Sequence, residues 1–141
     1  MEFAMSGLLA RSQLAGGQPG DARRTIETLR VRFASSGLTR FLPNMDAMLC
    51  RVALHTGDLD AAGRWYRKKA PRDPMHLNVM LRYQYLTQAM TELAFGDASA
   101  ALMTLAPLEP YCVSCARHID GIHLCALRAI ALYRKKDERW W

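Results

Sequence analysis

The spacing of apolar side chains predicts a chain made of helices alone. Apolar residues recur three or four positions apart along most of the sequence, which places them on one face of a helix. No segment of useful length alternates apolar and polar residues as a half-buried strand would. Glycine and proline clusters divide the pattern into seven expected helices, at about residues 3–15, 22–35, 43–55, 59–69, 76–95, 98–105 and 115–135. The sixth could extend to residue 108. We therefore expect an all-α fold.

Three copies of the skeleton Leu-x2-Gly-x4-Ala join successive helices. The copies are Leu14/Gly17/Ala22, Leu54/Gly57/Ala62 and Leu93/Gly96/Ala101. Their leucines are 40 and 39 residues apart, and a repeat of about this length is typical of helical solenoids. The repeat predicts antiparallel helix hairpins stacked into a right-handed superhelix of about seven helices, with a period of about 40 residues.

Aligning the copies on the turn glycine shows a small residue facing a large one. Small residues stand seven positions before the turn: Ala10, Cys50, Ala89 and, in a fourth partial copy aligned on Lys136, Ala129. Large residues stand nine positions after it: Ile26, Tyr66 and Leu105. Such pairs let two helices approach to about 8–10 Å without leaving a void. In the fourth copy a turn at Lys136–Asp137 would begin an eighth helix.

Aspartates next to the turns are interpreted as helix caps. Asp21, Asp58 and Asp97 can each accept from a free backbone N–H at a helix start. The carboxylate pairs Asp58/Asp60 and Asp137/Glu138 are explained in the same way. No nucleophile motif accompanies the serines. We therefore expect no catalytic residue and no enzymatic activity.

The repeat resembles the tetratricopeptide repeat in its small residue before the turn and its alanine after it. Its period is longer than the 34 residues of that repeat. Particular stretches are similar to the helical-repeat region of LuxR-type, MalT-like bacterial transcriptional regulators. They are Phe41–Ala47, Arg51–Asp58, Arg64–Trp65, Arg82–Leu86, and Arg117–Ile119 followed by Ala129–Tyr133. The resemblance covers about residues 7–141.

This resemblance implies a larger cytoplasmic protein with three parts. In that family an amino-terminal ATPase precedes the helical repeats and a carboxy-terminal helix-turn-helix binds promoters. The present sequence has no Gly-x4-Gly-Lys-Ser/Thr phosphate loop. We therefore expect residues 1–141 to be a single helical-repeat domain from a larger regulator, with repeats at about 3–36, 43–70, 76–110 and, in part, 115–141. Contact with DNA is expected only through a helix-turn-helix outside this chain.

Charge, cysteine spacing and the length of apolar runs indicate the expected location of the protein. The formal charge is +6, and five cations lie within nine residues: Arg64, Arg67, Lys68, Lys69 and Arg72. They could meet phosphates, but without an aromatic platform they are interpreted as the solvated end of a helix. No apolar run approaches the roughly 18 residues of a membrane span, and no leader peptide is recognisable. Four unevenly spaced cysteines favour reduced thiols. We expect a cytoplasmic protein that does not enter a membrane.

One cysteine pattern could bind a metal. Cys112 and Cys115 form a Cys-x2-Cys pair that suits tetrahedral zinc, and His118 could supply a third ligand. A fourth ligand is not evident, since His123 points to a different helix face from His118. Thiols packed between helices are the simpler interpretation. We expect no metal and no cofactor.

Binding is expected on the first helix of each repeat, which lines the concave face of such a superhelix. The polar and aromatic residues there that stacking does not require are Asn44, Arg51, His55, Asn78, Arg82, Tyr85, Gln88, His118 and Arg128. We expect a non-catalytic sensor segment of a LuxR-type regulator that binds a small-molecule effector or a protein partner. A free-standing scaffold that docks peptides is the main alternative, and a basic solenoid that binds nucleic acid is another. An incomplete last repeat would expose an apolar end, which predicts a homodimer.

Overall fold

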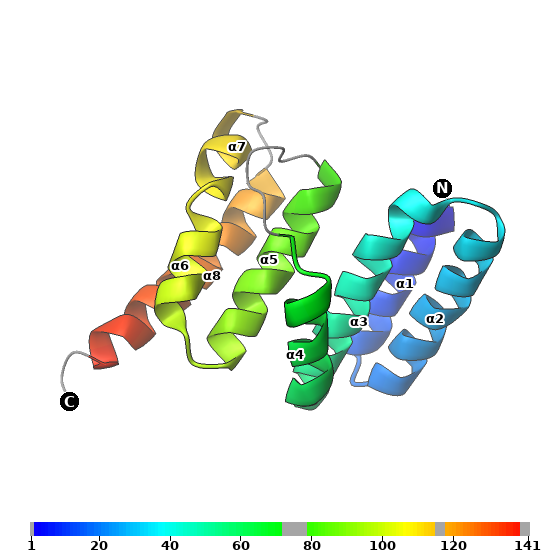
Figure 1. Cartoon of the computed structure of the whole chain (residues 1–141), viewed down its shortest axis with the longest axis horizontal. Coiled ribbons are helices and arrows are strands. Elements are labelled where there is room, and N and C mark those ends of the chain that lie inside the picture. The colour runs from blue at the N-terminus through cyan, green and yellow to red at the C-terminus, as the bar shows by residue number, and fades with distance from the viewer. Residues whose placement is uncertain (1, 72–78, 115–117, 139–141) are drawn as a thin grey trace. The chain divides into compact units, whose positions relative to one another are not determined.

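The chain is helical wherever the structure describes it. The computed structural model describes residues 2–71, 79–114 and 118–138, and these contain helices and no strand, which confirms the all-α fold (Figure 1). The elements are α1 (Glu2–Ala15), α2 (Pro19–Ser35), the short 3-10 helix η1 (Thr39–Phe41), α3 (Leu42–Thr56), α4 (Leu59–Lys68), α5 (Val79–Ala94), α6 (Ala98–Leu105), α7 (Leu108–Ser114) and α8 (His118–Glu138). Within the described ranges no helix is long and apolar enough to cross a membrane.

Two compact units share the chain, Met1–Lys69 and Ala70–Trp141. In the first unit α2 packs against both α1 and α3, and α4 packs against α3. Its core includes Ile26, Leu29 and Met45, and three phenylalanine rings close one side at centroid separations of 5.0–6.0 Å: Phe3, Phe33 and Phe41. The superhelix expected for the whole chain stays a prediction, as does the expectation of a single domain.

The second unit has a core of its own. There α6 packs against both α5 and α8, and the short helix α7 packs against α8. Leu105 and Leu108, both fully buried, lie at the centre of a cluster that also takes Leu86 from α5 and Leu124 and Leu127 from α8. The two units therefore share one arrangement. In the first unit α2 packs between α1 and α3, and in the second α6 packs between α5 and α8.

The turns of the repeat have one backbone geometry. Gly17, Gly57 and Gly96 have φ of 76°, 77° and 82°, values that an L side chain seldom adopts. At Gly57 the glycine N–H donates to Leu54 O at 3.3 Å and the next N–H donates to Ala53 O at 2.9 Å. This is the hydrogen-bond pattern of a Schellman motif. The alanines five positions later, Ala22, Ala62 and Ala101, are each 0% exposed. The repeat skeleton is thus visible in the fold.

Two of the three expected aspartate caps are confirmed. Asp58 accepts from the Ala61 N–H at 3.1 Å and Asp97 accepts from the Ala100 N–H at 2.9 Å. The prediction for Asp21 is wrong, because α2 begins three residues earlier with Pro19 in its first position. Proline fits there since its fixed φ suits a helix and it has no N–H to leave unpaired. Asp21 instead lies in the first turn and pairs with Arg24.

The carboxy-terminal helices differ most from expectation. The short helix α7 was not expected, and it carries Pro110 within its first turn, where proline is tolerated. The turn expected at Lys136–Asp137 is wrong, because α8 continues to Glu138. The other turns of the repeat have a glycine that adopts positive φ, and Lys136 supplies none. The expected helix starts at His76 and Cys115 lie outside the described residues.

Candidate functional site

Three of the residues expected to bind lie on one face of α3. Asn44, Arg51 and His55 are spaced by seven and four positions, which keeps them within about 40° around a helix. Asn44 is buried, Arg51 is half-buried and His55 is exposed. Asn44 and Arg51 both have interaction partners. Within the first unit the structure therefore brings these three together.

In the second unit the expected residues are mostly enclosed or paired. Arg82 and Tyr85 are buried in α5, and Gln88 is half-buried with its Oε1 atom enclosed and without a hydrogen bond. Arg82 lies 3.0 Å from Asp120, and Arg128 forms an ion pair with Glu109 at 2.6 Å. Asn78 and the side chain of His118 lie outside the described residues.

The described cysteines are free thiols. Cys50 and Cys112 are buried and Cys125 is exposed. The possible zinc ligands cannot be placed as a set, because Cys115 and the side chain of His118 lie outside the described residues. Among the described residues no group of three His, Cys, Asp or Glu side chains could hold a metal ion.

A groove between α3 and α4 gathers a different set of residues. It has a volume of about 270 Å³ and lies within the first unit. Its lining from α3 is Asp46, Leu49, Cys50 and Ala53, and its lining from α4 and the residue that follows it is Ala61, Arg64, Trp65, Lys68 and Lys69. Around α3 these residues lie opposite the face that carries Asn44, Arg51 and His55, as their sequence positions require.

The sequence of α4 explains how this groove forms. The Asp58 cap and the Gly57 turn start the helix close to the end of α3, and Ala62, 0% exposed, lets it approach. Trp65 then turns its ring inward and is only 6% exposed. Arg64 and Lys68 are one turn apart on the same side of α4, and both line the groove.

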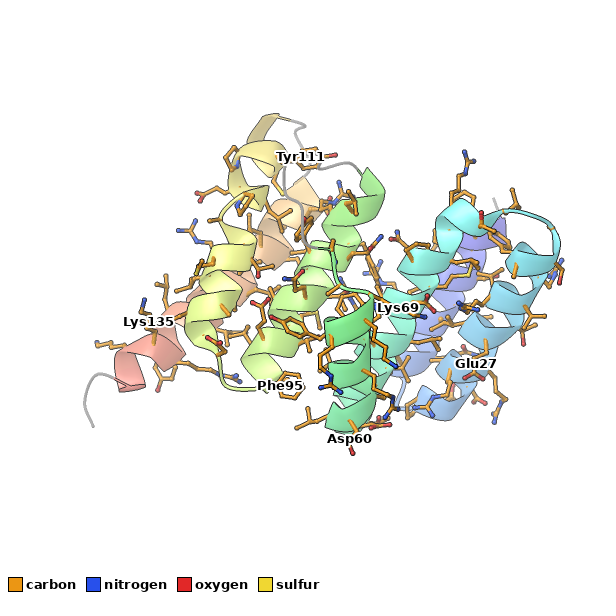
Figure 2. The ribbon with its side chains drawn as sticks, in the orientation of Figure 1. Glu27, Asp60, Lys69, Phe95, Tyr111 and Lys135 are labelled. Atoms are coloured by element: carbon orange, nitrogen blue, oxygen red, sulfur yellow. The ribbon has the colours of Figure 1, made fainter. Side chains whose placement is uncertain are left out.

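Charge in the groove is unevenly balanced. The Asp46 side chain, 12% exposed, accepts from Arg30 Nε at 2.9 Å and from Lys69 Nζ at 3.0 Å. This one carboxylate is therefore shared by two cations. Arg64 and Lys68 form no ion pair with any residue that the structure describes. Figure 2 labels Lys69 at one end of α4 and Asp60 at the other, and Asp60 is not among the residues that line the groove. The groove has an excess of positive charge.

Comparison of the three hairpins shows how the lining of this groove differs from its equivalents. In the first hairpin the Thr25 hydroxyl donates to Gln13 Oε1 at 2.8 Å, and in the third the Thr104 hydroxyl donates to Glu92 Oε1 at 2.7 Å. These residues stand four positions before and eight positions after the turn glycine. The second hairpin has Ala53 and Trp65 at those positions, which replaces a polar link by an apolar pair.

The first hairpin has a groove of its own at equivalent positions. It measures about 330 Å³ and is lined by Ser6, Arg24, Thr25, Thr28, Leu29 and Arg32. Its two arginines are engaged, Arg24 by Asp21 and Arg32 by another contact. It lacks an aromatic wall. The α3–α4 groove is therefore the stronger candidate for a ligand.

Sequence reasoning found part of this site and missed the rest. Arg64, Lys68 and Lys69 were identified as a basic cluster and interpreted as a solvated helix end. Trp65, Cys50 and Ala53 were not identified as site residues. The repeat alignment could have identified Ala53 and Trp65. The second copy has these two apolar residues at the positions where the first and third copies have a hydrogen-bonded polar pair.

The arrangement is suited to binding an anion that has an apolar part. A guanidinium and an ammonium without partners can hold a carboxylate or phosphate, and Trp65, Leu49 and Ala53 can contact an apolar body. No protein-family model, characterised protein or solved structure matches this chain.

Proposed function

We propose that this chain is a non-catalytic binding module whose α3–α4 groove takes a small organic anion with an apolar body. The observation that carries the proposal is the local departure from the repeat. Where two hairpins are linked by a threonine hydrogen bond, the second presents Trp65 beside the uncompensated charges of Arg64 and Lys68. A volume of about 270 Å³ is at the lower limit for ligand pockets, so the ligand is small.

Such a module would act by ligand-dependent population shift. A ligand changes a conformational equilibrium only through different affinities for the two states. Contacts from both α3 and α4 would make binding sensitive to the angle between these helices. The resemblance to LuxR-type regulators suggests the role of such a shift, which is to let the module sense an effector for a transcriptional regulator in the cytoplasm.

A protein partner is the second candidate, and the exposed cations of α4 favour an acidic peptide. Arg64, Arg67, Lys68 and Lys69 are all exposed or line the groove edge within two turns of the helix. A peptide carboxylate would use the same Arg64 and Lys68 heads. It would also reach Arg67, which does not line the groove. This residue therefore distinguishes the two candidates.

The test uses the fluorescence of Trp65 as the reporter. Replacing Trp140 and Trp141 by phenylalanine leaves Trp65 as the only tryptophan. Phenylacetate and phenyl phosphate serve as anionic probes, and phenylacetamide is the neutral control. We expect both anions, and not the amide, to change the emission with saturation, because only the anions engage Arg64 and Lys68.

Matched variants locate the binding. Arg64→Gln and Lys68→Gln should each weaken binding at least about tenfold, since a hydrogen bond to a charged group contributes about 1.5–3 kcal/mol. Arg67→Gln removes the same charge from the same helix outside the groove and should leave the affinity within about twofold. Equal losses in all three variants would contradict a groove ligand and show that affinity follows the total charge of α4, as the acidic-peptide candidate requires. Absence of saturation by either anion would contradict the proposal.

A further inference from the structure

One face of α8 is apolar and uncovered. Ile122 and Tyr133 are 71% and 69% exposed, and Ala126 and Ala129 between them are also exposed. The spacings of four, three and four positions place all four residues in one stripe along the helix. Cys125 and Ile130 flank the stripe and are exposed too. An exposed apolar stripe of this kind indicates an interaction surface.

The opposite face of α8 packs against its core through the same repeat positions as α3 does. Leu124, Leu127 and Ala131 face the core of the second unit. When the repeats are aligned on Gly57 and Lys136, their equivalents in α3 are Met45, Met48 and Val52, which belong to the core of the first unit. Helix α8 thus packs on α6, and α3 on α2, through the same positions.

The exposed stripe of α8 lies where the other hairpins bind their second helix. The small residue seven positions before the turn is 4% exposed at Ala10, 3% at Cys50 and 0% at Ala89. In each of these three hairpins the helix that carries it packs against the following helix. Its equivalent in α8 is Ala129, which is exposed. Helix α8 therefore has a surface shaped to receive another helix, and no described residue of this chain occupies it.

We propose that this surface pairs with the same surface of a second copy of the chain, with the two α8 helices antiparallel. The stripe is self-complementary in that orientation. The register that sets Ile122 against Tyr133 of the second copy also sets Ala126 against Ala129 of the second copy. The small alanines meet at the two-fold axis, where the helices approach most closely, and the large residues close both ends.

Helix dipoles select the antiparallel orientation, because antiparallel dipoles attract and parallel dipoles repel. The residues of the last turn give no preference, since Lys135 and Lys136 are followed there by Asp137 and Glu138. The molecule carries a formal charge of +6, so added salt should strengthen the pairing by screening repulsion between copies.

The pairing should be weak. A single helix face is smaller than the roughly 800 Å² per partner of a standard stable interface. We therefore expect a dissociation constant of about 10–100 µM. This inference rests on the second unit alone and is independent of the ligand proposed for the first.

Sedimentation of the full chain over a concentration series tests the proposal. The wild type should change from monomer to dimer across the range of about 1–500 µM. Ala126→Glu places a charge at the two-fold axis and should weaken association more than tenfold. Because residue 126 is exposed and glutamate is a good helix former, circular dichroism should show the same helix content. Leu8→Glu in α1 and Met103→Glu in α6 are the matched controls, at positions 63% and 77% exposed, and should leave association unchanged.

A cross-link tests the register. Ala126→Cys in a Cys125→Ser background should form an intermolecular disulfide on mild oxidation, because the two copies of residue 126 lie next to the axis. Met103→Cys in the same background should not. The proposal is overturned if the wild type stays monomeric up to about 500 µM, or if Ala126→Glu associates as the wild type does. It is equally overturned if Leu8→Glu abolishes association, since α1 would then be the contact.

Discussion

At the scale of single residues, the repeat depends on a few positions whose requirements are steric. Gly57 adopts φ of 77° and Ala62 is fully buried against the preceding helix. Both features could be predicted from the sequence, because only glycine takes this conformation freely and only a small side chain permits the close approach. The prediction for Asp21 was wrong since Pro19 competed for the same helix start and fits it better.

Two glycines provide a paired prediction at this scale. Gly57→Ala should destabilise the protein by about 1–2 kcal/mol, because alanine at positive φ is strained although no atom lies near its added Cβ. Gly20→Ala, inside α2, should stabilise by about 0.5–1 kcal/mol, since its Cβ also meets nothing and its backbone is helical. Urea denaturation followed by circular dichroism measures both. A loss of stability in Gly20→Ala would show that space, and not φ, decides the effect.

The candidate site was harder to predict than the turns, because the role of each residue there depends on its neighbours from another helix. Arg64 and Lys68 are visible in the sequence as a basic cluster, but their meaning depends on what α3 places opposite them. Whether a cation is solvated or lines a groove is set by tertiary packing. Asp46 illustrates this, because it comes from α3 and is shared by Arg30 and Lys69, which are 16 and 23 positions away in the sequence.

At the scale of helices, α5 carries an unusual number of buried polar side chains. Thr87 and Thr91 are 0% exposed, and their hydroxyls donate to the backbone carbonyls of Tyr83 and Thr87, four residues earlier. This satisfies each hydroxyl within its own helix. Arg82 is also buried, and it lies 3.0 Å from Asp120 of α8. The Nη1 atom of Arg82 has no hydrogen bond, so the ion pair is the main interaction that offsets the cost of burying its charge.

This ion pair provides a prediction about how α5 holds α8. Asp120→Asn should cost about 2–3 kcal/mol, because it leaves a guanidinium that is 9% exposed without a counter-charge. The double variant Arg82→Met/Asp120→Leu should recover most of that loss, since it removes both buried charges together.

Urea denaturation measures these variants against a surface pair. Glu109→Gln breaks the pair between Glu109, 54% exposed, and Arg128, 40% exposed, and should cost less than about 1 kcal/mol. If Asp120→Asn costs no more than Glu109→Gln, the pair between α5 and α8 has no special role.

Helix identity was easier to predict than helix ends. The long helices follow from the spacing of apolar residues, and the confirmed caps at Asp58 and Asp97 follow from their position after a turn glycine. Helix α7 was missed because Pro107 and Pro110 suggested an interruption, yet a proline in a first turn is compatible with a helix. The continuation of α8 was missed because the repeat was extrapolated to Lys136, which cannot replace a turn glycine.

At the scale of the whole molecule, the two units have separate hydrophobic cores. One is built from α1, α2 and α3, and the other from α5, α6, α7 and α8. We predict that they unfold at different urea concentrations. In the variant whose only tryptophan is Trp65, fluorescence follows the first unit, whereas circular dichroism follows all helices. The two midpoints should differ. Coincident transitions with equal m-values would contradict the prediction and indicate one cooperative molecule.

The shared turn geometry has a consequence for how such a chain can change over time. Hairpin shape is held by the glycine and the alanine, which leaves the positions four before and eight after the turn free to vary in chemistry. Gln13 with Thr25, Ala53 with Trp65 and Glu92 with Thr104 are three solutions to the same geometric problem. Exchanging one such pair between hairpins would move a polar link or an aromatic wall without altering the backbone. New ligand chemistry can therefore arise in this architecture by substitution at two sites.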